Sequence, residues 1–197
     1  MIQAPRMLLI GSTGRNAGKT GLAAEIIRRF SGRLPVVGVK VTAIDERNGR
    51  CPRGGRGCGV CSSLTGEFCI TDEKDAPQGK DTRRLADAGA ARVYWLRVLK
   101  SRLEEGARAL LETIGGRAWV VCESNSLRTV LEPGLFLMVT PARPAAVKPS
   151  AAAVLNRADA TIPFDGAAFG FDIDNVTVTD TGWRLLPMKN TESFQSP

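Results

Sequence analysis

The sequence contains no histidine among its 197 residues. Mechanisms that use an imidazole base, and metal sites with an imidazole ligand, are therefore excluded. No apolar run approaches the roughly 20 residues of a membrane-spanning helix. The first apolar run, residues 7–10, is too short for a signal peptide and leads directly into a glycine-rich turn. We therefore expect a cytoplasmic protein with no membrane segment.

The overall composition is that of an ordinary globular protein, with 43% hydrophobic and 24% charged residues. The length fits one domain over residues 1–197. A net charge of +7 favours anionic partners such as nucleotides, phosphorylated cofactors or acidic protein surfaces. The basic residues are scattered among acidic ones, so we do not expect a dedicated nucleic-acid surface. The oligomeric state stays open, and a homodimer is one option.

The segment from Met7 to Thr20 has the arrangement of a phosphate-binding loop. A short apolar strand, a glycine-rich turn and Gly18-Lys19-Thr20 precede a helical pattern. Backbone N–H groups of such a loop form an anion site at the positive end of the helix. Lys19 would reach the β- and γ-phosphates, and the Thr20 hydroxyl would bind Mg²⁺. Thr13 stands where the consensus has a glycine. The expected nucleotide contacts are Gly14, Arg15, Asn16, Ala17, Gly18, Lys19, Thr20 and Gly21.

Strand-like and helix-like segments alternate along most of the chain. The expected strands are residues 7–10, 36–41, 92–98, 119–122, 136–140, 161–164 and 176–179, and the expected helices are 18–30, 101–114 and, after Pro149, 145–158. This alternation favours an α/β fold with a doubly wound, mostly parallel sheet. Ligands of such sheets bind at the carboxyl ends of the strands.

Three charged residues are expected at that edge of the sheet. Lys40 lies at the end of an apolar strand and would be costly to bury without an anion, although a surface lysine is the alternative. Asp81 opens a helical segment, which is the position of a capping acid. Glu123 follows another buried strand, where it could bind Mg²⁺ or orient a water. The next residues form a polar turn, Ser124-Asn125-Ser126, that could contact a substrate.

Residues 45–80 have no apolar period and contain four of the five cysteines. We predict a metal-binding insertion at 46–79. Four thiolates suit either a tetrahedral Zn²⁺ site or an iron–sulfur cluster, and both stay open. The second C-x2-C of a zinc ribbon is absent, a disulfide is disfavoured in the cytoplasm, and unliganded thiols are the remaining alternative. The four ligands would be Cys51, Cys58, Cys61 and Cys69, whereas Cys122 is expected to be a buried structural residue.

The chain resembles the B-protein family of molybdopterin-guanine dinucleotide biosynthesis, which are P-loop nucleotide-binding proteins. The residues that carry the resemblance are Gly18-Lys19-Thr20, Lys40 and the segment 79–90, Gly-Lys-Asp-Thr-Arg-Arg-Leu-Ala-Asp-Ala-Gly-Ala. Dethiobiotin synthetase is similar at a greater distance. The resemblance implies a P-loop NTPase fold, Mg²⁺ among Thr20, Asp81 and Glu123, and phosphates on Lys19 and Lys40. The chain departs from the family in lacking its histidine-containing stretch and in having Ser124-Asn125 after Glu123.

The expected function is Mg²⁺-dependent binding and slow hydrolysis of ATP or GTP, with Lys19, Asp81 and Glu123 as the catalytic residues. The resemblance implies a role accessory to assembly of a metal-containing or molybdopterin-type cofactor, with an assembly enzyme as partner. One alternative is a small-molecule kinase or ATP-dependent ligase of the dethiobiotin synthetase type. Another is a non-hydrolysing adaptor whose metal loop docks a partner enzyme.

Overall fold

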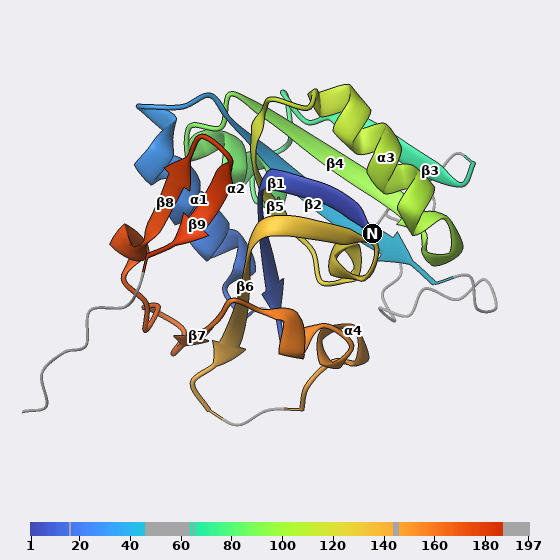
Figure 1. Cartoon of the computed structure of the whole chain (residues 1–197). Helices are drawn as coiled ribbons and strands as arrows, with labels where there is room; N and C mark the ends of the chain where they lie inside the picture. Colours follow the sequence, from blue (N-terminus) through green and yellow to red (C-terminus); the bar gives the residue numbers. More distant parts are fainter. Residues whose placement is uncertain (16, 46–63, 65, 144–145, 187–197) are drawn as a thin grey trace, which may run out of the picture.

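A computed structural model describes residues 1–15, 17–45, 64, 66–143 and 146–186 (Figure 1). Its main feature is a seven-stranded sheet with the order β3-β4-β2-β5-β1-β6-β7. All neighbouring strands are parallel except β3, which runs antiparallel to β4 at the edge. The strands are β1 (Ile2–Ser12), β2 (Val36–Ile44), β3 (Phe68–Asp72), β4 (Arg92–Leu99), β5 (Trp119–Glu123), β6 (Leu131–Pro141) and β7 (Ala160–Phe164).

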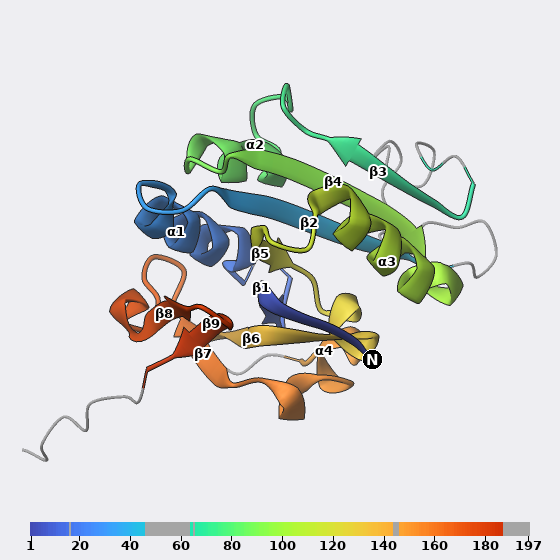
Figure 2. The same cartoon turned by 45° about the horizontal axis from the view of Figure 1, so that its top comes forward.

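Helices cover both faces of this sheet (Figure 2). One apolar core lies between the sheet and the helices α1 (Lys19–Ser31) and α2 (Asp81–Asp87). The other lies under α3 (Leu103–Ile114) and α4 (Pro149–Ala152). Short 3₁₀ helices occupy Lys100–Arg102, Ser126–Thr129, Leu155–Arg157 and Ile173–Asn175. The structure therefore confirms a mixed α/β architecture with a mostly parallel sheet, compatible with the doubly wound prediction.

A small hairpin completes the core on the α1 side. It consists of β8 (Val176–Thr179) and β9 (Gly182–Leu185). Trp183 of β9 is fully buried, and its ring packs edge-on against Phe30 at 4.9 Å and Trp119 at 5.7 Å between centroids. Its indole N–H donates to the carbonyl of Arg6, so the buried polar group is satisfied.

The two long helices form where the sequence pattern predicts them. In α1 the buried residues Leu22, Ile26 and Phe30 recur at helical spacing. Helix α3 ends at Ile114, and the next residue, Gly115, has a positive φ of 88°, which favours glycine.

Three segments differ from the sequence prediction. The predicted insertion is not structureless throughout, because β3 lies within it and packs the alternate residues Phe68 and Ile70 on the core. Strand β9 is not among the strands expected from the sequence, and it lacks the apolar alternation of β8. The helix expected over 145–158 is only α4 and a 3₁₀ turn, because the buried Val154 leaves the helical region at φ −134°. No described helix is long and apolar enough to cross a membrane.

The order of the strands fixes where a ligand can bind. Strand β1 lies between β5 and β6, and the chain leaves β1 toward β2 on one side and passes from β5 to β6 on the other. A crevice forms at such a switch point, outside the carboxyl ends of the strands. The register aligns Ile10 of β1 with Glu123 of β5, and Glu123 with Lys40 of β2. The glycine-rich loop and the predicted charged residues therefore share one edge.

Candidate functional site: a glycine-rich loop and two carboxylates

The glycine-rich loop joins β1 to α1 and depends on Gly18. Gly18 precedes the helix with φ 83°, a conformation that L side chains rarely adopt. A Cβ at this position would also lie 2.9 Å from the ring of Phe164. Thr13, which replaces the consensus glycine, is buried at the end of β1, where its N–H donates to the Val139 carbonyl at 3.0 Å.

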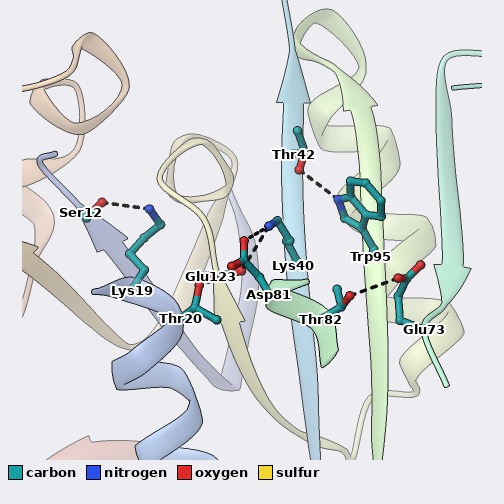
Figure 3. Close-up of polar contacts among 10 residues, drawn as sticks. All are labelled: Ser12, Lys19, Thr20, Lys40, Thr42, Glu73, Asp81, Thr82, Trp95 and Glu123. Atoms are coloured by element: carbon teal, nitrogen blue, oxygen red, sulfur yellow. Dashed lines mark hydrogen bonds and ion pairs between the residues drawn. The ribbon is translucent and has the colours of Figure 1, made fainter. Parts of the chain in front are cut away.

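The side chain of Lys19 turns back over the loop (Figure 3). Its Nζ donates to Ser12 Oγ at 2.9 Å, and Ser12 Oγ donates to the carbonyl of Gly14 at 2.8 Å. Helix α1 begins at Lys19 with no side chain capping it. The first N–H groups of a helix have no partner within the helix, so this end of α1 offers donors and a positive dipole to an anion.

Two further side chains brace the loop from outside. Asn125 is buried, and its side-chain amide pairs with both backbone groups of Ser12, at 2.8 and 2.9 Å. The backbone N–H of Lys148 donates to the Thr13 carbonyl at 3.0 Å, and the Lys148 ammonium contacts the carbonyl of Gly14. Sequence reasoning placed Asn125 in a polar turn near the site but missed Lys148, which has no motif around it.

Two carboxylates meet beside the loop (Figure 3). The Thr20 hydroxyl at the start of α1 donates to Glu123 Oε2 at 2.7 Å. The Lys40 ammonium is paired with Asp81 and lies 3.8 Å from Glu123 Oε1. Residues from α1, α2, β2 and β5 are thus brought together, although 103 positions separate Thr20 from Glu123.

The surroundings of the two carboxylates shift their pKa values in opposite directions. Burial raises the pKa of Glu123, and the nearby charge of Lys40 and the Thr20 hydroxyl offset this only in part. Burial also acts to raise the pKa of Asp81. There the hydrogen bond and charge of Lys40, with the Thr20 hydroxyl, outweigh burial and hold the pKa below its usual value. Glu123 is 4% exposed, and among the described residues its Oε1 has no hydrogen-bond partner.

The structure refines two of the sequence-based roles. Asp81 lies in the first turn of α2, but Lys80 occupies the capping position and no side-chain capping bond forms. Asp81 is therefore not the capping residue itself, although it is an acidic residue of the first turn, and its carboxylate pairs with Lys40. Lys40 lies at the edge formed by the carboxyl ends of the strands, as expected, and its described partners there are the two carboxylates.

A second set of polar side chains continues from Lys40 across β2, β4 and β3, and we call Thr42, Thr71, Trp95 and Arg97 the polar row. The indole N–H of Trp95 donates to the Thr42 hydroxyl at 3.0 Å (Figure 3). The Arg97 guanidinium stacks 4.7 Å from the ring of Trp95 and donates to the Thr71 hydroxyl at 3.4 Å. Sequence reasoning missed the polar row. The only signal was one polar residue at every second position of otherwise apolar strands.

Of the predicted site residues, the loop residues and the three charged residues lie together. Asn16 lies outside the described residues, as do Cys51, Cys58 and Cys61. Cys69 lies on β3, where its sulfur accepts from Arg97 at 3.3 Å. Within the described part of the chain, no three His, Cys, Asp or Glu residues group around a point that could hold a metal. The four-cysteine site therefore stays a prediction. Cys122 is fully buried, as predicted.

The geometry defines a mixed α/β protein with a glycine-rich loop and a carboxylate pair at the carboxyl edge of its sheet. Comparison with family models, curated proteins and solved structures finds no match to the chain. Any assignment of function consequently depends on the chemistry of this edge.

Proposed function

We propose that this chain is a Mg²⁺-dependent P-loop protein that binds ATP or GTP and hydrolyses it slowly. The observation that carries the proposal is the hydrogen bond from Thr20 to the buried Glu123. It joins the residue after the loop lysine to a carboxylate at the end of the neighbouring strand. This is the juxtaposition that a metal-bound triphosphate requires, with phosphates on the loop and oxygen ligands beside them.

The residues present suit Mg²⁺. This ion prefers hard oxygen ligands and keeps several waters, so a hydroxyl and one or two carboxylates are enough protein ligands. Thr20, Asp81 and Glu123 would supply them, and the buried Oε1 of Glu123, which accepts no hydrogen bond from the described residues, is an acceptor that such a shell would satisfy. When bound, the ion would neutralise charge on the β- and γ-phosphates.

The protein's own groups would then act by position and charge. The Lys19 ammonium leaves Ser12 and contacts the β- and γ-phosphate oxygens, while loop N–H groups donate to the phosphates. The carboxylate of Glu123 accepts a hydrogen bond from the attacking water and orients it toward the γ-phosphate.

Lys19→Ala tests the proposal. Loss of a charge-assisted contact of about 1.5–3 kcal/mol should weaken binding of Mg·ATP or Mg·GTP by about 10- to 100-fold in calorimetry. Lys74→Ala, which removes an exposed lysine after β3, is the matched control and should bind as the wild type does. Equal affinity in the wild type and Lys19→Ala would show that the loop does not bind phosphate.

The polar row favours a second candidate function, transfer of a phosphoryl group to a small molecule or ATP-dependent ligation of one. Lys40 and Thr42 lie on the same face of β2, and Figure 3 shows Trp95 beside them. An acceptor held there would adjoin the carboxylates. Turnover of nucleotide without added substrate favours hydrolysis. Turnover only with an acceptor favours transfer, and tight binding without turnover favours the non-hydrolysing adaptor.

The proposed biological role depends on the sequence motifs alone. An accessory role in assembly of a metal-containing or molybdopterin-type cofactor, with an assembly enzyme as partner, is supported by the resemblance of the loop, of Lys40 and of residues 79–90. A Zn²⁺ or iron–sulfur site in the insertion is supported by the number and spacing of its cysteines.

A further inference from the structure

Two phenylalanines form a stacked pair next to the glycine-rich loop, and we call Phe164 and Phe169 the aromatic pair. Their ring centroids are 4.6 Å apart and their planes are inclined by 26°. A backbone bridge joins the two residues. Between them, Asp165 Oδ1 accepts from the N–H groups of Ala167 and Ala168, both at 2.8 Å. The turn thus holds two rings in a fixed arrangement, and both remain partly exposed.

The aromatic pair borders the first turn of α1. A Cβ on Gly18 would lie 2.9 Å from the ring of Phe164, and a Cβ on Gly21 would lie 3.4 Å from the ring of Phe169. The two glycines therefore let the rings approach the backbone that precedes and follows Lys19-Thr20. This backbone is the one that would donate to phosphates.

The site has two different sides about β1. The carboxylates and Lys40 come from β5, β2 and α2, on one side. The aromatic pair comes from the end of β7, on the other side, beyond β6. A triphosphate whose β- and γ-phosphates face the carboxylates must direct its ribose and base away from them. On the β6–β7 side, both rings of the pair lie within 3.0 Å of where a Cβ on Gly18 would stand.

We propose that the aromatic pair is the platform on which the base of the bound nucleotide stacks. This inference rests on the proposed function. The turn between the rings is Asp165-Gly166-Ala167-Ala168, in which Asp165 Oδ1 is already engaged. The platform therefore contacts the flat face of the base and not its hydrogen-bonding edge. Because every base has such a face, stacking by itself does not select one base. ATP and GTP should bind with similar affinity, and pyrimidine triphosphates more weakly because their ring is smaller.

The test compares whole nucleotides with inorganic tripolyphosphate, all with Mg²⁺, by calorimetry. Phe169→Leu keeps an apolar side chain but removes the ring. It should weaken the binding of ATP and of GTP by about fivefold or more. It should leave tripolyphosphate affinity unchanged. Phe169→Tyr keeps the ring and should restore nucleotide affinity. Phe171→Leu is the matched control, since Phe171 packs on the same core and lies two positions further along.

Each outcome bears on the inference. A selective loss of nucleotide affinity in Phe169→Leu, with rescue by tyrosine, supports the platform. An equal loss for nucleotide and tripolyphosphate would show that the pair only packs against the loop, and no loss for either would place the base elsewhere. If the wild type binds tripolyphosphate and ATP equally well, the platform fails while the phosphate site stands. If it binds neither, both proposals fail.

Discussion

Glu123 illustrates what a single residue can contribute and what it costs. Its side chain is almost fully buried, and one of its oxygens has no hydrogen-bond partner in the described part of the chain. Burial of an ionised carboxylate is unfavourable unless the charge is paired and hydrogen-bonded. Lys40 at 3.8 Å and the Thr20 hydroxyl stabilise the charge only in part, since the net effect is a raised pKa. Ionisation of Glu123 is therefore less favourable in the nucleotide-free fold than in the unfolded chain.

Glu123→Gln should separate stability from activity. The pKa of Glu123 is higher in the folded than in the unfolded chain, so the charged form destabilises the fold only above the unfolded value of 4.5. Near pH 7.5 the glutamine variant should melt at a higher temperature than the wild type, because the amide buries no charge. Below the unfolded pKa the difference should disappear. Mg²⁺-dependent turnover should be lost.

The exposed Glu112→Gln on α3 is the control for this comparison. It should change neither the melting temperature nor turnover. A glutamine variant at position 123 that melts lower than the wild type at neutral pH would show that the buried charge is stabilising. Retained turnover would remove Glu123 from the catalytic set.

At the scale of elements, one side chain connects three of them. Lys40 from β2 pairs with Asp81 at the start of α2 and approaches Glu123 at the end of β5. Two carboxylates close together repel each other, and the nearby ammonium of Lys40 offsets that repulsion in part. The same two carboxylates are the proposed metal ligands. Lys40 thus occupies, in the absence of metal, the electrostatic role that Mg²⁺ would take.

Lys40→Met should make the fold respond to Mg²⁺ without nucleotide. Removing the ammonium leaves Asp81 and Glu123 without their counter-charge, so the variant should melt several degrees lower in the absence of divalent ions, about 2–4 °C for each kcal/mol lost. Millimolar Mg²⁺ should restore much of this stability because it binds the folded state. The wild type should shift little. Differential scanning calorimetry with and without Mg²⁺ measures both effects.

Lys80→Met serves as the control, because Lys80 precedes Asp81 at the same helix start but is exposed. It should behave as the wild type does. If Mg²⁺ stabilises Lys40→Met and the wild type equally, Lys40 does not compete with the ion. If Mg²⁺ stabilises neither variant, the two carboxylates do not bind it in the absence of nucleotide.

For the whole molecule, the central question is how the cysteine-rich insertion relates to the sheet. Cys69 is part of β3, which extends the sheet at its edge, and its sulfur contacts the buried Arg97 of β4. If Cys69 is also a metal ligand, the metal would connect the insertion to the sheet. Metal binding would then supply folding free energy to a segment with few apolar residues.

Replacing both Cys58 and Cys61 by serine tests this connection. Protein purified without oxygen should contain about one Zn²⁺ and be colourless, or contain an iron–sulfur cluster and be brown. The double variant should lose the metal and become sensitive to protease within residues 46–79. Nucleotide binding should persist, because the loop and carboxylates belong to other strands. Metal content is measured by elemental analysis and cleavage sites by mass spectrometry.

Cys122→Ser is the control for thiol loss, since Cys122 is buried in the core, away from the insertion. It should leave the metal content unchanged. Metal-free protein whose insertion thiols all react rapidly with a thiol reagent would contradict the metal-binding prediction. The insertion would then be a segment of unliganded thiols.

The alternation of elements could be predicted because it depends on local patterns. A glycine-rich turn and apolar residues at helical spacing predict helix α1. Short runs of apolar residues predict strands β2 and β5. Strand β3 was missed because its residues Cys69 and Thr71 alternate with only two apolar ones. Its pairing with β4 is a contact between distant parts of the chain. The polar row was also missed, because its residues come from three strands that meet only through contacts between distant parts of the chain.

The sequence by itself determined the loop, because Gly18-Lys19-Thr20 requires only a strand before it and a helix after it. It also placed Asp81 and Glu123 at the ends of their elements, whereas Lys40 lies within β2, which continues to Ile44. Only the tertiary structure decided their partners. Lys40 faces two carboxylates, and the aromatic pair adjoins the loop, because the strand order brings distant segments to one edge. Strand order depends on how the two faces of the sheet are buried, and no local pattern encodes it.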